Sequence, residues 1–317
     1  MNLLVVVLGS QLLYYLLIAQ TGVVGAFDSH IHDLYTLPIG GVIGALFSAF
    51  WRHHGLKQEL CFLFGVQMMI SWFYPNYSLG MLMTLGFVVG YTAPLLLYIF
   101  ASQGKLQLSL GLAISYAIGT AFYTYPFAER DDIAIILPLI SVAALRFTHL
   151  KRVERLKHPR FPWKAVGVMM VWIFADSALF ETLSRSGSMD IWSNYTLLII
   201  TSHLAGVYVA YRFGGELIKH TPIILGLFAL SYSLYWMNKP ILLAVVYPIA
   251  ISYYNVLLFY TLMRMRDIRT IALSMIGVGW VAASAANVVA LGHQLWMSAA
   301  ILTIFALVYS FYVRRTS

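Results

Sequence analysis

Charge is scarce in this chain, because only 10% of its 317 residues are Asp, Glu, Lys or Arg. A typical soluble domain carries about 25% charged residues. The single cysteine, Cys61, excludes an intrachain disulfide and a thiolate metal cluster. The sequence also lacks the Gly-x-x-x-x-Gly-Lys-Ser/Thr loop that binds nucleotide phosphates. It therefore predicts neither an ordinary soluble domain, nor a disulfide scaffold, nor a pump driven by ATP.

Apolar residues make up 61% of the chain. A soluble fold cannot cover that much apolar surface, whereas lipid can solvate it. In lipid the backbone must satisfy its own hydrogen bonds, so the spans are helices or a closed barrel. The apolar stretches have the roughly 17–25 residues that a helix needs to cross a membrane, and they lack the alternation of barrel strands.

The sequence thus predicts an all-α integral membrane protein with twelve transmembrane helices. The expected spans are residues 3–25, 34–51, 59–75, 79–101, 105–125, 132–149, 163–183, 191–212, 221–237, 240–263, 268–291 and 294–313.

Lysine and arginine segregate to one set of loops. If the N-terminus is inside, 17 of the 20 fall in the even-numbered loops or the C-terminal tail. The exceptions are Arg130, Arg185 and Lys239. The positive-inside rule therefore predicts that both termini are cytoplasmic, and we expect the bacterial inner membrane. Because the basic charge reads as a topology signal, we expect no nucleic-acid partner.

The longest polar stretch lies at the middle of the chain and is rich in Lys and Arg. We predict an N-terminal six-helix half at 1–150, a basic cytoplasmic linker at 151–163 and a C-terminal six-helix half at 164–317. The other connections are short, so we expect the chemistry to lie within the membrane.

Two groups of six spans around a basic loop, with both termini inside, resemble the major facilitator superfamily of transporters. In that superfamily the loop after the second helix reads Gly-x-x-x-Asp-Arg-x-Gly-Arg-Arg, and the matching loop here is Arg52-His53-His54-Gly55-Leu56-Lys57. The resemblance implies that Arg52, Gly55 and Lys57 form a gating loop. Arg52 stands in place of the acid, so the role of that acid is not carried over. The fifth helix also lacks the Gly-Pro motif of the antiporters, and the chain is short for the superfamily. It therefore resembles a short, motif-degenerate member.

Small residues recur at every fourth position on four predicted helices, where they allow close helix approach in lipid. They are Gly40, Gly44 and Ser48; Gly111, Ser115 and Gly119; Gly206, Ala210 and Gly214; and Gly279 and Ala283. The resemblance implies contacts between the halves, with the second helix on the eleventh and the fifth on the eighth. The alternative is that such residues are common in any membrane bundle.

Asp176 is the clearest ionisable residue deep in a predicted span, and no Lys or Arg lies one turn away. Such residues tend to mark ion or substrate paths, and buried carboxyls without a cation can exchange protons near neutral pH. We expect a proton-coupling or cation-binding site, with a neutral acid that bonds a neighbouring helix as the alternative. His203, in the middle of the eighth span, suits a proton relay or is a structural histidine.

Cavities of the superfamily are lined by the first, fourth, seventh and tenth helices, with help from the second, fifth, eighth and eleventh. That resemblance adds further substrate- or proton-binding candidates on this chain. They are Gln11, Tyr14, Tyr91, Tyr116, Tyr254, Asn255 and Trp280. The 21 tyrosines favour a polar cavity for an organic, aromatic or amphiphilic substrate.

The first predicted outer loop combines imidazole and carboxylate side chains. His30, His32 and Asp33 are candidate ligands for a divalent metal. The plainer alternative is a solvated polar turn, and we expect no resident metal or cofactor.

The leading functional hypothesis is a monomeric secondary transporter and not an enzyme. It would move a small organic solute, such as a metal chelate or an amphiphile, by alternating access coupled to protons. One alternative is an integral membrane enzyme of the lipid-linked transferase type that acts through the loop histidines. The other is a non-transporting assembly protein with the same fold.

Overall fold

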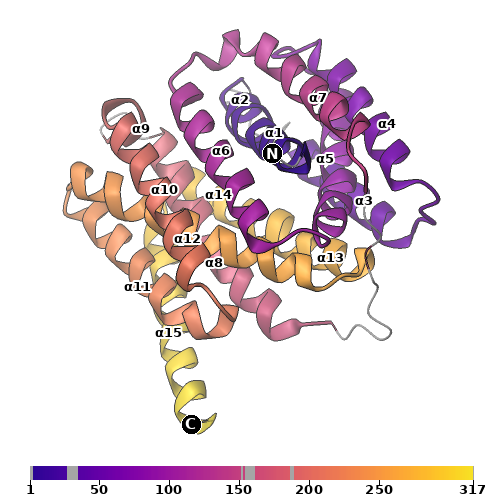
Figure 1. Ribbon diagram of the computed structural model, residues 1–317. Coiled ribbons are helices and arrows are strands. Elements are labelled where there is room, and N and C mark those ends of the chain that lie inside the picture. The colour runs from indigo at the N-terminus through magenta and orange to yellow at the C-terminus, as the bar shows by residue number, and fades with distance from the viewer. Residues whose placement is uncertain (1–2, 27–34, 151–152, 154–160, 186–188, 317) are drawn as a thin grey trace. The chain divides into compact units, whose positions relative to one another are not determined.

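The computed structural model describes residues 3–26, 35–150, 153, 161–185 and 189–316, and every regular element in those ranges is helical (Figure 1). The predicted all-α class is confirmed for that part of the chain. In chain order the elements are α1 (Leu3–Tyr14), the π-helix η1 (Tyr15–Gln20), α2 (Thr21–Ala26), α3 (Thr36–Phe50), α4 (Leu56–Ser71), α5 (Leu79–Phe100), α6 (Lys105–Tyr123), the 3-10 helix η3 (Phe127–Glu129), α7 (Asp131–Arg146), α8 (Trp163–Arg185), α9 (Ile191–Asn194), α10 (Thr196–Phe213), α11 (Leu217–Trp236), α12 (Pro240–Arg264), α13 (Ile268–Met275), the π-helix η4 (Ile276–Ala282), α14 (Ala283–Leu291) and α15 (Leu295–Thr316).

Eight helical segments among the described residues are long and apolar enough to cross a membrane. They are Leu3–Val23, Leu79–Phe100, Lys105–Tyr123, Trp163–Ser184, Thr196–Phe213, Leu217–Trp236, Pro240–Arg264 and Ile268–Leu291. α4 and α7 are shorter, at 16 residues each, and carry acidic residues in their first turns. The chain is an integral, multi-pass membrane protein, while the twelve spans and the cytoplasmic termini stay predictions.

The chain divides into two compact units. The first comprises 1–161 and 259–276, and the second comprises 162–258 and 277–317. Most of the predicted linker, at 151–152 and 154–160, lies outside the described residues. The division into halves at 1–150 and 164–317 stays a prediction, and the placement of 259–276 in the first unit was not foreseen.

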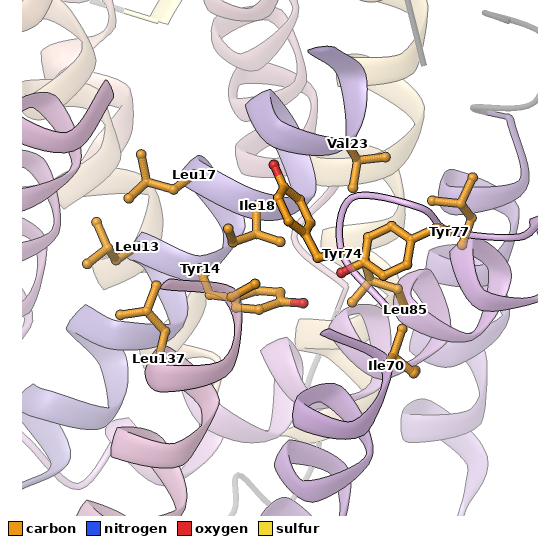
Figure 2. Close-up of a cluster of buried hydrophobic side chains, with 12 residues drawn as sticks. Leu13, Tyr14, Leu17, Ile18, Val23, Ile70, Tyr74, Tyr77, Leu85 and Leu137 are labelled. Atoms are coloured by element: carbon orange, nitrogen blue, oxygen red, sulfur yellow. The ribbon is translucent and has the colours of Figure 1, made fainter. Parts of the chain in front are cut away.

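In the first unit, α1 packs on α6 and α7, and α4 packs on α5 and α7. Side chains of α1 and η1 form its core with those of α4, α5 and α7 (Figure 2). In the second unit, α8 packs on α11, α14 and α15. Hydrogen bonds described below join α12 to α8 and α10.

Glycine brings α3 and α5 into backbone contact within the first unit. A Cβ atom on Gly44 would lie 2.1 Å from the carbonyl oxygen of Phe87, and one on Gly90 would lie 2.0 Å from that of Gly41. In the same way, a Cβ atom on Gly40 or on Gly86 would lie 2.0 Å from a backbone carbonyl oxygen of the opposite helix. No side chain fits in this seam, so the glycines set the distance between the two helices.

Two of the other small-residue ridges also have partners in their own unit, whereas a Cβ atom on Gly279 of the fourth ridge would meet nothing within 4 Å. A Cβ atom on Gly119 would meet Leu16 of η1, and one on Gly206 would meet Ile249 and Ser252 of α12. α3 does contact α13, the start of the predicted eleventh span, but its glycines face α5. Three of the four ridges therefore bring together helices of one unit, which the sequence did not predict.

Candidate functional site

Asp176 lies in the middle of α8 and is bound by two tyrosines of α12. The Tyr247 hydroxyl donates to Oδ1 at 2.8 Å and also contacts the Asp176 carbonyl oxygen at 3.0 Å. The Tyr254 hydroxyl donates to Oδ2. Seven residues make about two helical turns, so both tyrosines project from the same face of α12. The carboxyl thus ties α8 to α12, with one hydroxyl on each oxygen.

Aromatic side chains pack around this carboxyl. The Tyr254 ring lies 6.2 Å from that of Trp172 and 5.6 Å from that of Phe228. The Tyr232 hydroxyl donates to the Ala175 carbonyl oxygen at 2.8 Å and contacts Ser298 Oγ at 2.6 Å. These rings are fully buried, whereas Asp176 keeps part of its surface accessible. The carboxyl therefore lies among buried aromatic side chains, with a tyrosine hydroxyl on each oxygen.

No Lys or Arg forms an ion pair with Asp176 within the part of the chain that the structure describes. Tyrosine hydroxyls supply hydrogen bonds but no opposite charge. An ionised carboxyl in an apolar helix is costly without a cation. A proton or a small cation is the partner that would complete this site chemically.

His203 is buried in α10 and binds the other side of α12. Its Nδ1 lies 2.7 Å from Ser252 Oγ, and the ring also bonds the backbone of Pro248. Ser252 and Tyr254 are two residues apart, or about 200° around the helix, so they face opposite ways. The structure thus separates Asp176 and His203 by α12, and the arrangement of His203 suits a clamp between α10 and α12.

Two candidates on α1 bind neighbouring helices of the first unit. Gln11 Nε2 donates to Ser141 Oγ of α7 at 2.7 Å, and Gln11 is partly buried. The Tyr14 hydroxyl lies 2.7 Å from Ser71 Oγ of α4, and Tyr14 is only 1% exposed. Tyr14 therefore belongs to the core of the unit (Figure 2).

Three further candidates are partly buried and lie on different helices. Tyr116 is on α6, Asn255 is on α12, and Trp280 is in the π-helix η4. π-helical turns occur often at functional sites, so the position of Trp280 in η4 is consistent with a functional role. Binding roles for all three stay predictions.

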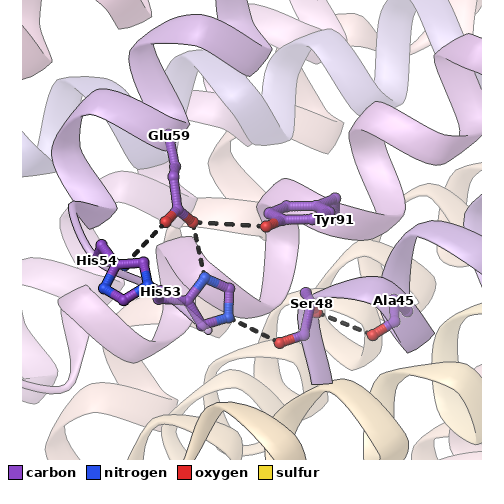
Figure 3. A network of polar contacts seen from close by, with 6 residues as sticks. All are labelled: Ala45, Ser48, His53, His54, Glu59 and Tyr91. Atoms are coloured by element: carbon purple, nitrogen blue, oxygen red, sulfur yellow. Dashed lines mark hydrogen bonds and ion pairs between the residues drawn. The ribbon is translucent and has the colours of Figure 1, made fainter. Parts of the chain in front are cut away.

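A polar network occupies the loop after α3 (Figure 3). His53 Nδ1 lies 2.7 Å from Glu59 Oε2, and His53 Nε2 lies 2.8 Å from the Ser48 carbonyl oxygen. Glu59 also accepts from the His54 backbone N–H at 3.3 Å and from the Tyr91 hydroxyl at 3.5 Å. The network joins the end of α3, the start of α4 and the middle of α5.

His53 and Glu59 form a hydrogen-bonded pair within this network. Both ring nitrogens of His53 face oxygen acceptors, and a neutral imidazole carries only one N–H. Sequence reasoning missed both residues, because a polar loop gives no sign of which side chains meet. Their signal was an acid at the start of the third predicted span.

Of the predicted gating-loop residues, Lys57 forms side-chain hydrogen bonds to another helix, whereas Arg52 is exposed. Lys57 Nζ donates to the carbonyl oxygens of Arg146 and Thr148, at 2.7 and 2.9 Å, and so caps the end of α7. Gly55 precedes α4, and its carbonyl oxygen accepts from the Glu59 N–H. The carboxylate that this loop contacts is that of Glu59. A gating role for Arg52, Gly55 and Lys57 stays a prediction.

Replacing Glu59 with alanine is expected to lower the midpoint of thermal unfolding by about 2–5 °C, because His53 and the His54 N–H lose their acceptor. The matched control is Glu216→Ala, which removes a solvent-exposed pair with Lys219 and should leave the midpoint unchanged. Unfolding of detergent-purified protein, followed by tryptophan fluorescence, measures both. Equal midpoints for the two variants would contradict a structural role for the network.

The candidate metal ligands His30, His32 and Asp33 lie outside the described residues. Among the residues that are described, no three His, Cys, Asp or Glu side chains are grouped to hold a metal ion.

No protein-family model and no curated protein matches this chain. Solved structures do match over nearly its whole length. The human organic anion transporter MFSD10 (TETRAN) has a TM-score of 0.71 at 14% identity, covering 97% of this chain and 98% of that one. The proton:xylose symporter XylE has a TM-score of 0.63 at 14% identity, covering 96% and 94%. A bacterial homologue of the iron transporter ferroportin, in its outward-facing state, has 0.60 at 11%, covering 99% and 98%. The chain therefore has the major facilitator fold.

Proposed function

We propose that this chain is a secondary active transporter that moves a small organic solute by alternating access, with Asp176 as its proton-coupling site. The observation that carries the proposal is the carboxyl in the middle of α8, held by Tyr247 and Tyr254 without a basic partner in the described residues. The fold shared with three transporters supports the same conclusion.

Protonation of Asp176 changes the hydrogen bonds between α8 and α12. The ionised carboxyl accepts from both tyrosine hydroxyls. A proton on one oxygen turns that oxygen into a donor, so the tyrosine facing it must rotate its hydroxyl and accept instead. Proton binding therefore favours a different arrangement of the two helices, and a ligand that prefers one arrangement is coupled to the proton.

The substrate class stays broad. The structural neighbours are described as an organic anion transporter, a proton:xylose symporter and a homologue of an iron transporter, and these three solutes differ in charge and size. A thermal-shift screen of the purified protein should begin with those three classes, using a fluorescent organic anion, xylose and a ferrous chelate. A probe that raises the unfolding midpoint is then taken into uptake assays in liposomes.

Asp176→Asn is expected to reduce proton-driven uptake of that probe at least 100-fold, because the amide cannot take up and release a proton. The unfolding midpoint should fall by only a few degrees, since asparagine can still accept from one tyrosine. The matched control is Asp132→Asn, at an exposed carboxyl at the start of α7, which should transport normally. Full uptake by Asp176→Asn, or wild-type uptake that is indifferent to a protonophore, would rule out the coupling role.

A further inference from the structure

A cluster of polar groups lies inside the apolar core of the first unit. Gln67 and Ser71 are one turn apart on α4, Tyr14 is on α1, and Tyr77 precedes α5. All four are buried, with exposures of 1% for Gln67 and Tyr14, 0% for Ser71 and 6% for Tyr77. Figure 2 shows the Tyr14 and Tyr77 hydroxyls turned toward each other between Ile18, Ile70 and Leu85. The environment is apolar, so each polar atom needs a partner.

Three atoms of this cluster have none within the described residues. They are Gln67 Nε2, Gln67 Oε1 and the Tyr77 hydroxyl. Gln67 and Tyr77 both lie close to the Tyr14 hydroxyl, but no hydrogen bond of normal geometry joins either of them to it. A buried polar group without a partner costs about 1–3 kcal/mol, and native proteins seldom leave several in one place.

The existing bonds determine what the cluster still requires. Ser71 Oγ donates its only proton to the backbone carbonyl oxygen of Gln67 at 2.8 Å. The Tyr14 hydroxyl must therefore be the donor in its 2.7 Å bond with Ser71 Oγ. The Tyr14 oxygen is then an acceptor. Tyr77 and Gln67 Nε2 are donors, and Gln67 Oε1 is an acceptor. The missing partner must therefore both donate and accept, and no charged side chain belongs to the cluster to select an ion.

We infer that this cluster binds one water molecule, which accepts from Tyr77 and from Gln67 Nε2 and donates to Gln67 Oε1 and Tyr14. Buried waters typically make about three such bonds to otherwise unpaired groups. The water would join α1 to α4 at the point where α1 passes into the π-helix η1. It would thus stabilise the first unit independently of any transported solute.

Gln67→Met tests this inference, because methionine has a similar length but no polar atoms. If water fills the site, the variant removes the hydrogen bonds between that water and the Gln67 amide. The unfolding midpoint should then fall by about 4 °C. Tyr77→Phe should act similarly, and the double variant should lose less than the sum of the two, since both bind the same water. The matched control is Ser109→Ala, which removes another unpartnered buried hydroxyl and should not lower the midpoint.

An unchanged or raised midpoint in Gln67→Met would overturn the inference, because it means that the amide is an unfilled group whose removal is favourable. Strict additivity of the two substitutions would overturn it as well. If Gln67→Met does not fold, an experimental map that resolves ordered water keeps the inference testable. A single density peak within hydrogen-bond distance of Gln67 and Tyr77 supports it, whereas no peak, or an elongated one, contradicts it.

Discussion

Gly90→Ala is expected to lower the midpoint of thermal unfolding by about 6–10 °C, which corresponds to about 3 kcal/mol of overpacking. The added methyl carbon would lie 2.0 Å from the Gly41 carbonyl oxygen and 2.7 Å from its carbonyl carbon. Those are backbone atoms, so no side chain can rotate away, and α3 must move from α5. Gly44 and Gly86 face the same seam and would have to shift with it.

The matched control for this substitution is Gly65→Ala on the neighbouring helix α4. A Cβ atom there meets nothing within 4 Å, and alanine favours a helix over glycine by about 1 kcal/mol. Its midpoint should therefore stay the same or rise. Unfolding of the two variants in one detergent measures the contrast. If Gly90→Ala is as stable as Gly65→Ala, the close approach of α3 and α5 is wrong.

Arg130→Met is expected to cause the second large loss of stability. Arg130 lies between η3 and α7, is only 3% exposed, and donates four hydrogen bonds. Its guanidinium binds the carbonyl oxygens of Leu17, Tyr123 and Tyr125 at 2.8, 2.7 and 3.0 Å, and Thr21 Oγ1 at 2.9 Å. Burial lowers the pKa of Arg130, but arginine stays protonated in proteins. One cation therefore holds the π-helix η1 against the end of α6.

Methionine keeps the apolar stem of Arg130 but leaves three carbonyl oxygens without their donor, of which that of Leu17 is in a buried bond and the other two are in part-buried bonds, and this should cost about 3–5 kcal/mol. The unfolding midpoint should fall by about 10 °C. Arg130→Lys should be intermediate, because an ammonium has the charge but not the planar fork of donors. The matched control, Arg146→Met, removes an exposed arginine and should change little. An Arg130→Met midpoint within 2 °C of the control would contradict the clamp.

Sequence patterns were enough to identify the solvent and the helical class. The scarcity of charge requires lipid around the chain, and lipid requires backbone groups to bond within a helix. The predicted spans therefore coincide closely with helices, such as α5 at Leu79–Phe100 for the expected 79–101. The position of Asp176 near the middle of its helix could also be predicted, because the expected span at 163–183 coincides with α8.

The partners of these residues could not be predicted in the same way. A soluble helix has an apolar stripe that shows which face is inside, but in lipid both faces are apolar and the stripe disappears. Nothing local therefore shows that Asp176 faces Tyr247 and Tyr254 while His203 binds the opposite side of α12. The same applies to the His53–Glu59 pair, to the Arg130 clamp and to glycines that face α5. Helix rotation and register determine those contacts, and they arise only when the helices pack.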